Sequence, residues 1–440
     1  MWQTIKNSFA DANIRKRIII TLLLLLVYRV GCFVPLPGLD FAVFQGLGDN
    51  DLVSMLNMIT GGSMEYGTIF ALGIIPFINA SIIMQLLTLV IPKLEKLSKD
   101  GDEGRKKINQ YSRYLSILLG IIQAIGIVVS WRASIKGVFG TSKVSEVFTM
   151  IFIVLILTGG SAFVMWLGER ITEYGIGNGT SLIIFVGILA TLGGNLWRAM
   201  VKTIPDRAQQ GDYEGVWYLL GFVILVILLF GLIVFVDNSE RRIPVQYAKQ
   251  IKGNKMYGGQ STHIPIKVNS GGVMPIIFAS SLIMFPQMIM QFADSSMSSG
   301  FVRWWYDWLW VGHGYLYGPI LFLLIIFFAY FYAQIQFNPD DIARMIQQNG
   351  GFIPGIRAGK STSDYLRKIN NRITLFGALY LGIVALIPTY ILGYVSGFQE
   401  IGLNGAFTAT GLLIVVSVAL ELDKQLQSQL MIKNNRGFLK

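Results

Sequence analysis

Ten apolar stretches, each long enough or nearly long enough to cross a membrane, constrain this chain more than any other feature. They cover residues 18–34, 69–91, 114–131, 149–168, 180–197, 216–236, 272–292, 315–333, 373–394 and 401–420. A helix of about 20 apolar residues spans the hydrocarbon core of a bilayer. Charged residues are almost absent from the stretches, and only Arg29 is clearly embedded in one. The sequence therefore predicts an all-α integral membrane protein with ten transmembrane helices.

The lysines and arginines are distributed asymmetrically between the segments that join these stretches. If the N-terminus is placed in the cytoplasm, 28 of the 36 basic residues lie on the cytoplasmic side. Short cytoplasmic loops of membrane proteins carry such an excess of positive charge. We therefore expect an even number of spans, with the N- and C-termini both cytoplasmic. No small-residue cleavage site follows the first stretch, so we expect it to remain as a span.

The composition and the motifs argue against enzymatic chemistry. Only 14% of the residues are charged, and the chain has one cysteine and two histidines, whereas soluble domains average about 25% charged residues. Residues 354–361 resemble a phosphate-binding loop, but Pro354 occupies the position of the required first glycine. Paired carboxylates for acid–base work are missing from the apolar stretches. We expect no catalytic residue, no cofactor and no metal site.

A short internal repeat links the second apolar stretch to the seventh. The pattern Gly-x-x-Pro-x-Ile-x-Ala-Ser begins at Gly73 and again at Gly272, an offset of 199 residues. Ten spans divide into two sets of five, and because five is odd the second set must be inverted relative to the first. Inverted repeats usually place the working site at their interface, so we expect residues 1–200 and 201–440 to form two halves around a central site.

The segment after the first stretch is unusually apolar for a loop. Residues 52–59 are mostly hydrophobic and precede Gly61 and Gly62. Eight helical residues rise only about 12 Å, which is too short to cross a membrane. The segment is either a short helix at the membrane surface or a piece folded back among the spans, and the sequence leaves both open.

Two cytoplasmic segments of more than 30 residues, 237–271 and 334–372, are long for simple connections. Residues 240–247 and 263–268 alternate apolar and polar side chains around a turn-rich centre, which predicts a β-ribbon. Asn338 and Pro339 predict a helix start in the second segment. Both segments are basic, which favours docking on an anionic surface such as lipid or RNA. The alternative is that they are only solvated loops that set the topology.

Five motifs, in order along the chain, resemble the SecY/Sec61 family of protein-conducting channels. They are Gly73–Leu87, Ile171–Phe185, Ser239–Lys249, Gly272–Ser281 and Asn338–Thr362. The resemblance implies a clamshell of two inverted five-helix halves around an hourglass pore. It also implies a lateral gate, between spans 2 and 3 on one side and spans 7 and 8 on the other, through which hydrophobic segments pass into the bilayer.

The resemblance further implies roles for individual residues. The waist of the pore would be a ring of six isoleucines: Ile78, Ile82, Ile184, Ile188, Ile277 and Ile414. A plug at about residues 52–66 would include Leu52, Met55, Leu56, Met58 and Ile59. Polar gate positions would be Asn79, Gln85 and Gln123, and partner docking would involve Arg241, Arg242, Lys249 and Arg357.

The partners implied by the resemblance are the small membrane subunits SecE and SecG, the SecA motor ATPase, the ribosome through its RNA, translocating preproteins with their signal peptides, and anionic lipids. The implied location is the bacterial inner membrane. Two other functions remain open on the residues alone. One is secondary transport that uses backbone carbonyls and hydroxyls, and the other is a membrane receptor for ribosomes.

Overall fold

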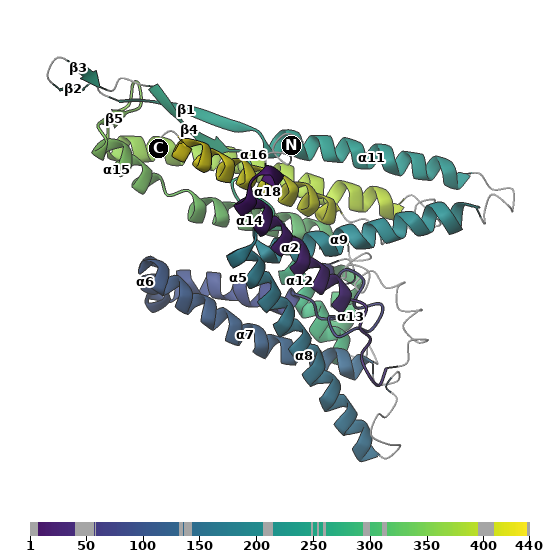
Figure 1. Cartoon of the computed structure of the whole chain (residues 1–440). Coiled ribbons are helices and arrows are strands. Elements are labelled where there is room, and N and C mark those ends of the chain that lie inside the picture. The colour runs from purple at the N-terminus through teal and green to yellow at the C-terminus, as the bar shows by residue number, and fades with distance from the viewer. Residues whose placement is uncertain are drawn as a thin grey trace.

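The fold is predominantly helical, with one small sheet (Figure 1). A computed structural model describes residues 8–39, 57, 59–131, 135, 143–205, 214–247, 250–252, 255–257, 261–293, 300–309, 315–394 and 409–437. A long helix overlaps each of the ten apolar stretches. These helices are α2 (Ala12–Gly31), α5 (Ile75–Val90), α7 (Gly101–Ser130), α8 (Lys143–Tyr174), α9 (Gly179–Arg198), α11 (Glu214–Asp237), α12 (Met274–Ala293), α14 (Tyr317–Gln336), α16 (Lys360–Tyr394) and α18 (Ala409–Gly437).

Within the described residues, six helices are long and apolar enough to cross a membrane, namely α7, α8, α9, α11, α14 and α16. A seventh crossing results if α5 is counted with α6 (Pro92–Lys99), which continues it after a bend of 106°. The bend has a local cause, because Ile91 is extended and Pro92 lacks the N–H that would continue the helix. The chain is thus a multi-pass membrane protein.

The β-ribbon predicted in the segment 237–271 is confirmed. Strand β1 (Glu240–Tyr247) pairs antiparallel with β4 (Ser261–Lys267), and β2 (Gln250–Lys252) pairs with β3 (Lys255–Tyr257) at the turn. Strand β5 (Gly351–Phe352) comes from the other long connecting segment, 334–372, and pairs with the end of β1, which the sequence did not predict. Helix α15 (Pro339–Gln348) begins after the N-cap Asn338, as predicted. A short helix, α13 (Gly300–Leu309), precedes α14.

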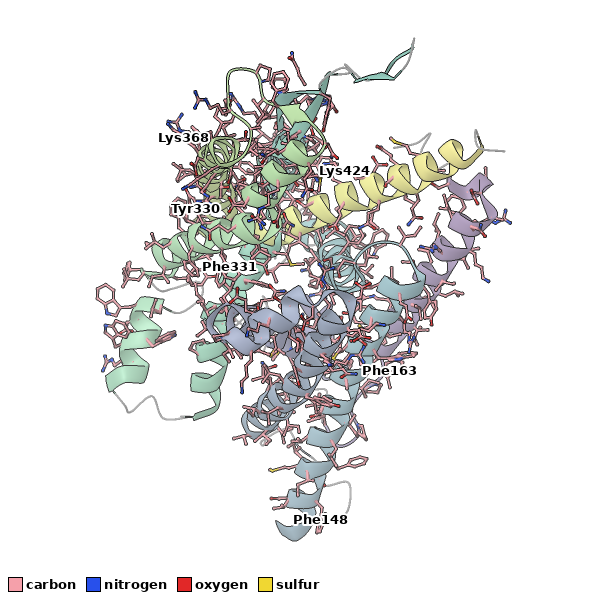
Figure 2. The ribbon with its side chains drawn as sticks, turned by 90° about the vertical axis from the view of Figure 1, so that its left-hand side faces the viewer. Phe148, Phe163, Tyr330, Phe331, Lys368 and Lys424 are labelled. Atoms are coloured by element: carbon pink, nitrogen blue, oxygen red, sulfur yellow. The ribbon has the colours of Figure 1, made fainter. Side chains whose placement is uncertain are left out.

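The sheet and the helices beside it form a unit with its own small core. Ile243 and Val245 of β1 pack with Ile266 of β4, Ile346 of α15 and Leu366 of α16. Figure 1 shows this unit at one end of the molecule, with α15 and the start of α16 beside the strands. In Figure 2, Lys368 of α16 lies toward that end, and Phe148 of α8 lies at the opposite end.

Candidate functional site

The six isoleucines predicted to form a ring lie together in the main hydrophobic cluster. They come from four helices of both halves: α5, α9, α12 and α18. Each is at most 8% exposed. On α5 and α9 the isoleucines stand four residues apart, so each pair shares one helix face. The structure therefore buries all six in one hydrophobic core, which also contains aromatic residues such as Phe278 and Phe328.

The start of each repeat helix positions one of these isoleucines by the same local geometry. Gly73 and Gly272 both adopt a positive φ, 53° and 60°, two residues before α5 and α12 begin. The Ile78 N–H donates to the Ile74 carbonyl, and the Ile277 N–H donates to the Val273 carbonyl. The repeat read in the sequence is therefore a repeated turn that sets where each helix begins.

The third helix of the cluster begins at a capped turn. The Asn178 side chain accepts hydrogen bonds from the Thr180 and Ser181 N–H groups at the start of α9. Such a cap satisfies donors that the first helical turn leaves unpaired. Gly177 precedes it with φ of 86°, a left-handed conformation that glycine adopts readily. The cap fixes the start of the helix that carries Ile184 and Ile188.

The end of the apolar segment 52–66 lies against this cluster. Ile59 is half-buried and packs on it. A methyl group placed on Gly187 would lie 2.9 Å from the Ile59 carbonyl oxygen, and one placed on Gly61 would lie 3.0 Å from the Gly187 Cα. This contact favours the alternative in which the segment folds back among the spans. The predicted plug residues Leu52, Met55, Leu56 and Met58 lie outside the described residues.

Helix α2 holds the same segment by two hydrogen bonds. The Tyr28 hydroxyl donates to the Thr60 carbonyl at 3.2 Å, and the Arg29 guanidinium donates to the Gly61 carbonyl at 2.5 Å. The sequence marked Arg29 as an embedded charge but gave no role to it or to Gly187. In the sequence, Arg29 stands out only as a cation inside an apolar stretch, and Gly187 only as a glycine between two isoleucines.

The polar residues assigned to the gate lie on helices that meet across the two halves. Helix α12 packs against α5 and α7. Gln85 of α5 accepts a hydrogen bond of 2.5 Å from the Tyr332 hydroxyl of α14. Asn79 and Gln123 are buried, and within the described residues neither atom of the Gln123 amide has a hydrogen-bond partner. An unpaired buried amide is costly, so the contact between α7 and its neighbours carries an energetic penalty.

Three of the four predicted docking residues are exposed on the sheet unit. Arg241 and Arg242 lie on β1, where Arg242 pairs with Glu240 at 2.8 Å. Arg357 lies between β5 and α16, and its carbonyl accepts a hydrogen bond from the buried Thr362 hydroxyl. Lys249 lies outside the described residues. The pairing of β5 with β1 therefore joins the two long connecting segments, 237–271 and 334–372, into one basic surface.

A carboxylate ties the two ends of the Arg357 segment together. Asp340, at the start of α15, accepts hydrogen bonds from the Ser363 hydroxyl and from Arg367 of α16, the latter at 3.0 Å. The Ser363 hydrogen bond, followed by the positive charge of Arg367, lowers the pKa of Asp340 below its usual value. Among the described residues, no group of three acidic, histidine or cysteine side chains could hold a metal ion.

Comparisons with known proteins agree on one family. A family model described as SecY matches residues 68–422. The chain is 45% identical over 447 residues to the protein translocase subunit SecY of Streptomyces galbus, covering 99% of both chains. It is 43% identical over 460 residues to the subunit of the same name from Mycobacterium bovis, again covering 99% of both.

Solved structures share the fold at lower identity. One described as "The structure of a protein conducting channel" aligns with a TM-score of 0.62 at 19% identity, covering 95% of this chain and 93% of that chain. Another, of Sec61 in a canine ribosome–channel complex, aligns with a TM-score of 0.58 at 17% identity over the same shares. These similarities show the fold of the chain.

Proposed function

The chain belongs to the SecY family of protein translocase subunits, which are not enzymes, and from this premise we propose that it forms the channel through which unfolded polypeptides cross the membrane. The observation that carries the proposal is the burial, within one hydrophobic core to which both halves contribute, of Ile78, Ile82, Ile184, Ile188, Ile277 and Ile414. Narrow apolar constrictions exclude water and ions. Isoleucine also offers a passing chain no hydrogen bond, so the ring seals at rest without binding any particular sequence.

The proposed architecture has ten crossings in two inverted halves, 1–200 and 201–440, with a pore between them. Helices α2, α12 and α18 add three crossings to the seven that length and apolarity identify. The segment 52–66 is the plug, on the outer side of the ring. The contact of α12 with α5 and α7, together with the Gln85–Tyr332 hydrogen bond, forms the closed lateral gate. When the gate opens, Leu-rich segments partition into lipid, whereas each central charge costs about 2.5–3.5 kcal/mol.

The proposal also names the partners that drive the polypeptide through the channel. The basic sheet unit with Arg241, Arg242, Lys249 and Arg357 faces the cytoplasm and receives the SecA motor or the ribosome. Among the structures with this fold are Sec61 and yeast Ssh1 bound to ribosomes. SecE and SecG complete the membrane complex, anionic lipids surround it, and the inner membrane of a bacterium is its location.

Reconstitution tests the channel. Vesicles that contain the chain with SecE- and SecG-like subunits should import a preprotein when SecA and ATP are added. A photoreactive group in the arrested preprotein should cross-link to Ile78 and Ile277. Import without those cross-links would place the path elsewhere, and absence of import would overturn the proposal.

The docking surface has its own test. Arg357→Glu should slow SecA-driven import while the complex still assembles, because the reversed charge repels an anionic partner surface. Lys360→Glu is a matched control, since Lys360 is also exposed three residues away. Equal import by wild type and Arg357→Glu would remove Arg357 from the interface.

A further inference from the structure

We propose that Arg29 is the positioning residue that holds the plug closed over the isoleucine ring, through its hydrogen bond to the Gly61 carbonyl. The inference rests on the proposed function and adds the residue that keeps the resting channel shut. Arg29 was the one clearly embedded charge in the apolar stretches. Charges inside spans are costly and are kept where they do specific work.

Consecutive residues of α2 bind consecutive carbonyls of the plug. Tyr28 donates to Thr60 and Arg29 donates to Gly61. The two donors differ, because the hydroxyl bond is neutral and the guanidinium bond is charge-assisted and therefore stronger. The Arg29 bond is also the shorter of the two, at 2.5 Å against 3.2 Å. Arg29 is thus the principal attachment of this part of the plug to α2.

The attachment lies directly beside the ring. Gly61 meets Gly187, which stands on α9 between the ring residues Ile184 and Ile188. A methyl group on Gly61 would lie 3.0 Å from the Gly187 Cα and 3.1 Å from the Arg29 Nη1. One small volume therefore contains the plug backbone, the ring helix and the guanidinium. Loss of the Arg29 bond frees the plug at the point where it contacts α9, the helix that carries Ile184 and Ile188.

The chemistry of the bond allows release as well as closure. The acceptor is a neutral carbonyl, so displacement of the plug leaves no buried unpaired anion. The Arg29 guanidinium also lies over the Phe33 ring, 4.9 Å from its centroid, which provides a second favourable contact for the cation. A passing polypeptide can therefore displace the plug while the charge keeps a partner two residues beyond the end of its own helix.

Resting conductance in planar bilayers tests the proposal. Arg29→Met should raise the open fraction of the idle complex at least about tenfold, the equilibrium equivalent of one charge-assisted hydrogen bond. Arg29→Lys, which can still donate to the carbonyl, should restore most of the closure. Arg17→Met removes an exposed cation from the same helix and should conduct like the wild type. A variant with the six ring isoleucines changed to glycine gives the conductance of an unsealed pore.

The outcomes separate the proposal from the function on which it rests. If wild type imports preprotein and Arg29→Met stays as closed as wild type while the ring variant leaks, the role of Arg29 is wrong and the channel stands. If wild type imports nothing, the function itself fails. Arg29→Met should import at a rate within about twofold of wild type, since the opened state needs no such bond. An import rate well below this range would mean that the substitution harms the whole channel. That result would overturn the assignment of Arg29 to closure alone.

A second variant covers the case in which Arg29→Met does not accumulate. Arg29→Gln keeps an N–H donor and removes the charge. Its resting conductance should lie between those of Arg29→Lys and the ring variant. A conductance equal to wild type would show that the charge has no part in closure.

Discussion

The start of α5 and the start of α12 share one turn but have different surroundings. Gly73 is buried, a methyl group on it would lie 3.0 Å from the Thr60 Cγ2, and its carbonyl accepts a hydrogen bond from Ser161 of α8. Gly272 is half-exposed, and a methyl group on it would meet no atom within 4 Å. The first glycine is thus crowded by Thr60 and held by Ser161 of a neighbouring helix, whereas the second glycine is uncrowded and its neighbour Gly271 packs against Tyr332 of α14. The comparison shows that the repeat glycine of α12 has more room around it than the repeat glycine of α5.

The largest expected effect is at the first copy. Gly73→Ala forces a side chain into a left-handed conformation and against the buried Thr60, so we expect the complex to lose about 2–3 kcal/mol of stability. Thermal unfolding of the purified complex measures this loss. A loss below about 1 kcal/mol would mean that the turn is not clamped.

The second copy should tolerate the same change better. Gly272→Ala meets only the backbone strain, which costs about 1–2 kcal/mol. The same unfolding measurement applies, with Gly193→Ala as a control, because a methyl group there also meets no atom within 4 Å and the helix is right-handed. If Gly272→Ala were as damaging as Gly73→Ala, the asymmetry between the copies would be lost.

A smaller effect should come from the hydroxyl that holds the first turn. Ser161→Ala leaves the buried Gly73 carbonyl without this donor and should cost about 1 kcal/mol. Ser280→Ala is the control in the second repeat, because its hydroxyl donates only within α12, to Ile277. Equal losses in the two variants would contradict a clamp specific to the first copy.

The smallest expected effect concerns Asp340 of the sheet unit, whose hydrogen bonds join α15 to the start of α16. The pKa of Asp340 is lowered in the folded chain, so its stabilising contribution is complete above the unfolded value of 3.8 and is lost as the pH falls below it. The melting temperature of wild type should therefore exceed that of Asp340→Asn at neutral pH, and the difference should shrink toward pH 3. A constant difference would mean that the carboxylate charge is not involved.

Local patterns in the sequence predicted local structure well. The alternation in residues 240–247, the Asn338 cap and the repeated glycines each depend on neighbouring residues, and the structure has the ribbon, the helix start and the turn. The ring isoleucines came from family resemblance and not from periodicity. Their burial in one cluster agrees with that assignment, although their role as a seal stays a prediction.

Contacts between distant segments were not predicted. Strand β5 has two residues, too few for any alternation, and its partner lies about 100 positions earlier. The Arg29 side chain could be recognised as embedded, but no pattern specifies which carbonyl it reaches 32 residues later. Some helices also begin well before the apolar stretch that predicted them. Helix α7 starts at Gly101, whereas the stretch starts at residue 114, because a helix can continue through polar residues outside the hydrophobic segment.

The position of the three-stranded sheet limits how the second half can rearrange. Strand β1 follows α11, β4 leads to α12 through a few residues, and β5 lies between α15 and α16. Hydrogen bonds between the strands thus link the sheet-side ends of α11, α12 and α16. A tilt of one of these helices therefore strains the paired strands unless the other two follow, which reduces the number of independent motions available to this half.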